Sequence, residues 1–473
     1  KRTVLGKGEK QQIDMFSNVP SENRGKDGYM VVEMDDVLPF LKEANDLMAL
    51  GRYAEAEKLY RPNVVLEMLA KGTQGWESPH DIAVNYGLCL NYMDRAVEAE
   101  KIFRTLEANS SKPATFYVNY SMTLNLLNKS RQSIDLCREG LKLFDDDIDI
   151  QGNLTIALLQ TREYEQAIES ALKRIKIRRD VHSLDEAACA LLEYATAIQH
   201  SDLPRSIELA KTAGNLIKEA LLLNPSYYYL QLRELALRRL IHDAEAVNTI
   251  APTLWRSESV PLGIRKAALV QMLEHWADNG YGTDVGAKSV LQFIKNQPGF
   301  RSDVPKLKEI ELRTIARYQM MRATGEVGQR VVVPEIADYF LKKEPSGQFL
   351  DPILAAQLKD WLGQSTEALN ILAEYLTDVP NDFYGNREMA WIYARNGNFI
   401  EATKYANALV NLAPWRAESY DCLAYVAKAA GNPILENDAR IKGDKVFAEE
   451  MKLYEEAKMY LDNSTTKANS INA

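Results

Sequence analysis

The sequence predicts an all-α solenoid, a superhelix in which antiparallel helix pairs stack one on the next. Its main sign is a fixed period. Four sets of three residues are spaced by 34 positions: Ala99, Ser133 and Ala167; Gly87, Ser121 and Thr155; Leu90, Leu124 and Leu158; and Phe103, Cys137 and Ala171. Small residues that recur with large apolar ones at such a period are typical of stacked helix pairs. Length agrees, because 473 residues exceed what one compact core usually organises.

The period places the elements in chain order. A first helix pair is expected at about 37–61, followed by three regular repeats at 80–113, 114–147 and 148–181. The period then loosens and returns with Ala368 and Ala402, which define repeats at about 349–382 and 383–416. We therefore expect a flexible N-terminal arm (1–36), N-terminal repeats (37–225), irregular helical repeats (226–348), C-terminal repeats with a capping helix that ends near residue 461 (349–461), and a disordered tail (462–473).

Each regular repeat has a small residue in its eighth position, an apolar residue in the eleventh, a small residue in the twentieth, and an apolar or small residue in the twenty-fourth. This register resembles the tetratricopeptide repeat and covers about half of the chain. The resemblance implies helix-turn-helix units whose first helices line the concave face. It further implies that the residues on this face are found at the second, fifth, sixth, ninth, twelfth and thirteenth positions.

Composition and motifs argue against several functions. A formal net charge of -9 argues against nucleic-acid binding, and no apolar run approaches the length of a membrane span. The sequence has no phosphate-binding GxxxxGK[ST] loop, no HExxH zinc motif and no GxSxG nucleophile motif. The five histidines and four cysteines show no metal-ligand spacing. We expect no catalytic activity, no metal and no cofactor. Free thiols favour the cytoplasm, with the periplasm as the alternative if a signal peptide was removed.

The sixth position of the regular repeats holds Asn85, Asn119 and Asn153. A primary amide matches the N–H and C=O of an extended backbone, so this ladder could hold a peptide by its main chain. The arrangement is similar to that of the tetratricopeptide superhelix of O-linked N-acetylglucosamine transferases, at these three positions only. The alternative is that asparagine is tolerated on a polar helix face. The fifth positions (Val84, Val118 and Gly152) lack the basic residues with which chaperone-binding members capture a carboxylate.

Apolar residues occupy two further positions of the same expected face. These are Leu88, Met122 and Ile156 at the ninth position, and Tyr92 and Leu126 at the thirteenth. An apolar strip exposed to water is unusual and indicates a partner. One alternative is that another part of the chain buries the strip. A candidate occupant is the N-terminal arm, whose apolar points are Ile13, Met15, Phe16 and the patch 30–32; otherwise the arm is only a leader.

The C-terminal repeats carry Trp361, Arg387, Trp391, Arg395 and Tyr425 at equivalent positions. Aromatic and arginine residues are enriched at the energetic centres of protein interfaces. A packing role near the cap is the alternative.

These features favour a non-catalytic scaffold or adaptor that binds a protein or an extended peptide on its concave face, with self-association left open. The alternative class is a regulatory or substrate-recruiting module of a larger enzyme, such as a protein kinase or a glycosyltransferase. A module of a polysaccharide or protein export system belongs to the same alternative.

Overall fold

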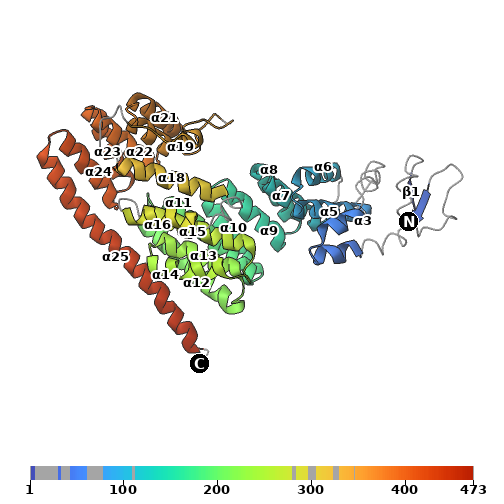
Figure 1. Ribbon diagram of the computed structural model, residues 1–473. Helices are drawn as coiled ribbons and strands as arrows, with labels where there is room; N and C mark the ends of the chain where they lie inside the picture. Colours follow the sequence, from blue (N-terminus) through green and yellow to red (C-terminus); the bar gives the residue numbers. More distant parts are fainter. Residues whose placement is uncertain are drawn as a thin grey trace. The chain divides into compact units, whose positions relative to one another are not determined.

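The computed structural model describes residues 2–5, 30–33, 43–60, 78–108, 112–279, 284–296, 305–322, 330–345 and 347–471 (Figure 1). Contacts divide the chain into two compact units, Lys1–Arg179 (unit 1) and Asp180–Ala473 (unit 2). The division falls at the end of the third regular repeat. The helix pair within 181–223, which follows this division, packs with the helices after it.

Unit 1 consists of helix pairs preceded by a short ribbon. Its elements are β1 (Arg2–Leu5), β2 (Met30–Glu33), α3 (Tyr53–Tyr60), α5 (Ser78–Tyr92), α6 (Ala96–Glu107), α7 (Ala114–Leu126), α8 (Ser130–Leu143), α9 (Ile148–Gln160) and α10 (Tyr164–Ile177). Residues 43–49 are also helical and precede α3. The strands β1 and β2 pair antiparallel, with Val4 opposite Val31. This ribbon lies in the expected arm and was not predicted, whereas Ile13, Met15 and Phe16 lie outside the described residues.

The eighth and twenty-fourth residues of each regular repeat are buried and vary in size in opposite directions. The pairs are Gly87 with Phe103, Ser121 with Cys137, and Thr155 with Ala171, all of them buried. A Cβ added to Gly87 would lie 2.5 Å from Cζ of Phe103. As the eighth residue grows from glycine to threonine, the twenty-fourth shrinks from phenylalanine to alanine. Because interiors are close-packed, a larger residue at one of these two positions requires a smaller one at the other.

One type of turn joins the two helices in these repeats. The fifteenth residue has a positive φ in Gly51 (72°), Asp94 (60°), Asn128 (55°), Arg162 (61°), Gly363 (82°), Gly397 (75°) and Gly431 (69°). This left-handed conformation is natural for glycine and costs other residues some strain. The next N–H then donates to the carbonyl of the spaced leucine at position eleven, as Lys129 does to Leu124 over 2.8 Å. The 34-residue leucines therefore serve both the core and the turn.

The regular elements among the described residues of unit 2 are helices, apart from an isolated β-bridge between Lys343 and Phe349. Its helices are α11 (Val181–Ile198), α12 (Leu203–Leu223), α13 (Tyr228–Leu240), α14 (Ala244–Arg256), α15 (Leu262–Asn279), α16 (Asp284–Lys295), α18 (Pro305–Arg322), α19 (Pro334–Phe340), α20 (Pro352–Trp361), α21 (Ser365–Asp378), α22 (Phe383–Arg395), α23 (Phe399–Leu412), α24 (Ala417–Ala429) and α25 (Pro433–Ile471). The returning 34-residue frame corresponds to α20 with α21 and to α22 with α23, as predicted. The frame alanines Ala368 and Ala402 are fully buried.

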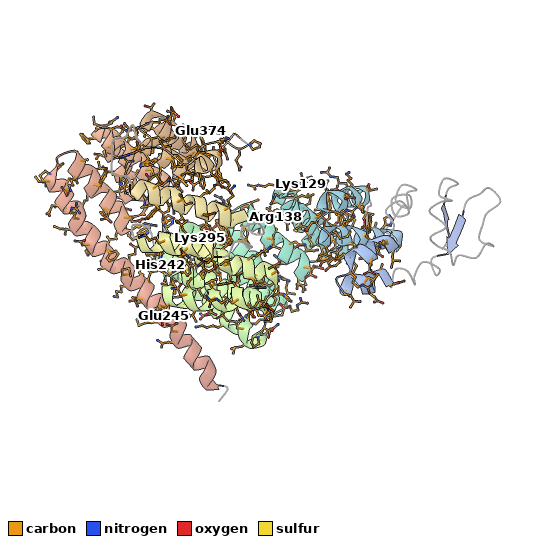
Figure 2. All side chains as sticks on the ribbon, in the orientation of Figure 1. Lys129, Arg138, His242, Glu245, Lys295 and Glu374 are labelled. Carbon is orange, nitrogen blue, oxygen red and sulfur yellow. The ribbon has the colours of Figure 1, made fainter. Side chains whose placement is uncertain are left out.

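Helix α25 is longer than expected and reaches back to the start of unit 2 (Figure 1). We expected it to end near residue 461, followed by disorder, but the helix continues to Ile471. Its first part packs on α24, and its distal part packs on α12. Tyr454 lies with its ring centroid 4.7 Å from that of His242 and accepts a hydrogen bond from Gln199 (3.4 Å). Figure 2 shows His242 and Glu245 beside this helix.

The distal end of α25 is held by one apolar contact and several polar ones. Leu461 is buried against Gly214 of α12, where an added Cβ would overlap the leucine side chain. Asp462 accepts from Arg238 (2.8 Å), and Lys458 lies 3.4 Å from Asp243. These contacts join residues more than two hundred positions apart, so unit 2 is not built from nearest-neighbour contacts alone, as an ideal solenoid would be.

We predict that Gly214→Val destabilises unit 2 by about 1–3 kcal/mol, because the new methyl groups overlap Leu461. Adding Leu461→Ala should recover part of this loss, with a coupling energy of about 0.5–3 kcal/mol between the two sites. The measurement is thermal unfolding together with hydrogen exchange of residues 454–462. Gly263→Val is the control, because a Cβ there meets nothing within 4 Å. Equal melting temperatures for the two valine variants would show that the packing of Leu461 against Gly214 does not stabilise unit 2.

Candidate partner-binding surface

The first helices of the regular repeats, α5, α7 and α9, lie side by side and contact one another in sequence (Figure 1). Successive second helices contact each other less. The first helices therefore lie on the tighter side of the stack in unit 1, as the repeat register predicts. Their outward-facing positions form the surface on which we expected a partner.

The apolar strip is present on this surface and is largely exposed. Tyr92 keeps 49%, Leu126 51% and Ile156 42% of its side chain accessible, while Leu88 and Met122 are half-buried. Tyr92 also stacks on Tyr53, with ring centroids 4.8 Å apart. We name these five residues, Leu88, Tyr92, Met122, Leu126 and Ile156, the first-helix row. Within the described residues, the alternative that another segment buries the row does not hold for its three exposed members.

The three asparagines of the ladder differ in their surroundings. Asn153 donates from Nδ2 to the carbonyl of Val118 (2.7 Å) and to Oγ of Ser121 (2.9 Å), both on the preceding repeat. Asn119 is only 8% exposed. Asn85 makes a longer contact, 3.4 Å from its Nδ2 to Oδ1 of Asn45. Peptide binding by the ladder stays a prediction. The hydrogen bonds of Asn153 and the burial of Asn119 could not be foreseen from their spacing in the sequence.

Sequence reasoning missed a second pair of asparagines, at the twelfth position. Asn91 donates to Oγ1 of Thr123 (2.8 Å), and Asn125 donates to the carbonyl of Asn153 (3.0 Å). Both are buried between neighbouring repeats. Their spacing of 34 residues was the available signal. They fix the register of one repeat on the next through polar contacts inside an otherwise apolar interface.

The C-terminal candidates form contacts with one another and with neighbours. The guanidinium of Arg387 lies between the rings of Tyr384 (4.9 Å) and Trp391 (4.6 Å) and is 8% exposed. The ring of Trp391 lies 6.0 Å from that of Tyr425. Because Arg387 is buried and stacks on two rings of its own helix, α22, it is poorly placed to meet a partner.

The two remaining candidates of this group, Arg395 and Trp361, contact residues outside that stack. Arg395 donates to Asp360 over 2.7 and 3.0 Å. Trp361 accepts a hydrogen bond at its carbonyl from Arg330, whose guanidinium lies 5.9 Å from the indole. The packing alternative therefore has more support here than it has in unit 1.

The described residues offer little reactive chemistry. Burial raises the pKa of the Cys89 and Cys137 thiols to about 11, so neither is a thiolate at neutral pH. No group of three histidine, cysteine or acidic side chains that could hold a metal occurs in the described part of the chain. Among the same residues, no helix is both long and apolar enough to cross a membrane.

The geometry of the repeats decides the type of fold. First and second helices of 12–15 residues alternate through 78–177, and their twentieth residues, Ala99, Ser133 and Ala167, are fully buried where the helices meet. Residues 78–177 thus form stacked antiparallel helix pairs of the tetratricopeptide-repeat type. No protein-family model matches this chain, and a search of curated proteins finds no match.

A search of solved structures finds matches at low sequence identity. The C-terminal part of a TPR repeat-containing protein from Cytophaga hutchinsonii has 14% identity and a TM-score of 0.31, covering 62% of this chain and all of that one. The Cut9–Hcn1 hetero-tetramer of APC/C has 12% identity and a TM-score of 0.46, over 82% of this chain and 80% of that one. A human IFIT1 dimer with PPP-AAAA has 13% identity and a TM-score of 0.31, over 78% and 81%. These likenesses concern the helical fold alone.

The hydrogen bonds of the asparagine ladder predict unequal effects of asparagine removal. Asn153→Ala should cost about 1–2 kcal/mol in the free energy of unfolding, because it removes two hydrogen bonds to the preceding repeat, one to the carbonyl of half-buried Val118 and one to the hydroxyl of buried Ser121. Asn85→Ala is the matched control at the same repeat position and should cost a few tenths, about 0.5 kcal/mol or less. Urea unfolding measures both. Equal losses in the two variants would mean that the Asn153 contacts do not stabilise the repeat interface.

Proposed function

We propose that this protein is a non-catalytic scaffold that holds a protein partner on the first-helix row of unit 1. One observation carries the proposal: large apolar side chains at the ninth and thirteenth repeat positions are repeatedly left accessible to water. The exposed residues are Tyr92 and Leu126 at the thirteenth position of the first two repeats and Ile156 at the ninth position of the third, on adjacent helices. Scattered exposed apolar residues are ordinary, but a periodic group on one face indicates an interaction surface.

Burial of this row would favour binding. Removing apolar surface from water stabilises by about 25 cal/mol per Å2. Three half-exposed large side chains can therefore anchor a partner without any charged contact. The rigid packing behind them helps, because the row residues lie on helices and lose little conformational freedom when bound.

The test replaces two row residues by lysine in the full chain, Leu126→Lys with Ile156→Lys. Partners captured from the native cells should fall by about tenfold or more, because a lysine would be buried against an apolar partner surface. The matched control is Val97→Lys with Leu172→Lys, whose native side chains are 60% and 41% exposed on second helices. Circular dichroism verifies that both variants remain folded. Equal loss of partners in the two variants, or no loss in the row variant, would contradict the proposal.

A further inference from the structure

Charge is segregated between the two helices of each regular repeat. The first helices α5, α7 and α9 contain no lysine or arginine, and their only acidic residues are Asp81 and Asp149, both in the first turn. The second helices α6, α8 and α10 carry five charged side chains each. Asp149 already has a cation nearby, Arg174 at 3.8 Å. The first-helix row is thus a neutral surface in a chain with abundant charge.

A neutral surface selects against charged partners. A carboxylate or phosphate brought onto the row would lose water without gaining a cation, and a basic segment would find no array of carboxylates. Such uncompensated desolvation costs more than the apolar contacts return. The complementary partner therefore presents an uncharged, apolar face.

The ladder distinguishes between an extended partner and a helical one. An extended segment has free main-chain N–H and C=O groups, which need partners on the groove. Asn153 has its Nδ2 bonded to Val118 and Ser121, and Asn119 is buried, so the ladder offers few free amides. A helix satisfies its own main chain and makes no such demand.

Spacing agrees with a helix. Packed helices lie about 8–10 Å apart, so equivalent row residues on α5, α7 and α9 recur at about that distance. Residues i and i+7 of a helix are separated by about 10.5 Å along its axis and lie on nearly the same face. A helix of about four turns that crosses the three first helices would place one apolar residue on each.

From these observations we propose that the first-helix row receives an amphipathic helix whose contacting face is apolar and uncharged. This inference rests on the proposed function and specifies the partner of the same surface. Because no cation is used, binding should be nearly independent of salt. Screening weakens exposed charge pairs as ionic strength rises but does not weaken apolar contacts.

The experiment uses the full-length chain and a phage-displayed library of random peptides of about 18 residues, long enough for five helical turns. Enriched peptides should carry apolar residues at helical spacing with no charge on that face. Their circular dichroism should show increased helicity on binding, and a proline at the centre should abolish it. The Kd should change by less than about twofold between about 50 and about 500 mM NaCl.

The Leu126→Lys, Ile156→Lys chain separates this inference from the proposed function. Neutral helical peptides that bind the intact chain and the Val97→Lys, Leu172→Lys control, but not the row variant, support both. Peptides that depend on the row but are charged, salt-sensitive or extended would overturn the helix inference and leave the proposed function standing. Peptides that bind all three chains equally would count against the row itself. A selection that yields no neutral helical peptide dependent on the row would overturn the inference.

Discussion

Close packing between the two helices of a repeat constrains the rest of unit 1. At the eighth and twenty-fourth positions the side chains exchange volume, from Gly87 with Phe103 to Thr155 with Ala171, and all are buried. Complementary volumes at these positions let each helix pair pack closely and present the same faces to the next pair. The first helices then lie against one another, and their ninth and thirteenth residues fall into register. The row is a consequence of this packing, and its apolar, neutral character is a separate property of the sequence.

Unit 2 adds a constraint that a simple stack of repeats lacks. The first part of helix α25 packs on α24, and its distal part packs on α12, where Leu461 contacts Gly214. The ring of His200, between α11 and α12, also lies 5.2 Å from that of Tyr384 in α22. Early and late helices of the unit are thus joined directly. We expect unit 2 to unfold more cooperatively than an open array, because loss of one contact at the junction affects helices far apart in sequence.

The sequence was sufficient for the repeat frame because packing there is local and periodic. Buried alanines at position twenty and small residues at position eight could be located from spacing alone. The direction of a side chain's hydrogen bonds has no such periodic signal, so the engagement of Asn153 with Val118 and Ser121 could not be foreseen. The distal docking of α25 was hidden for another reason. Its contacts span more than two hundred residues, and the only local trace is a glycine, Gly214, within a long helix. The ribbon of β1 and β2 was missed because four-residue strands carry too little pattern.

Site-specific photo-crosslinking is the most direct test of partner binding at the first-helix row. A photoreactive phenylalanine analogue would replace Leu126 or Ile156 in the full chain within the native cells. Val97 and Leu172, similarly exposed on second helices, would be replaced in parallel. If the partner binds the first-helix row, covalent partner adducts should form at positions 126 and 156 and none at 97 and 172. Adducts that arise from 97 or 172 but not from 126 and 156 would contradict this prediction and place the partner on the charged face.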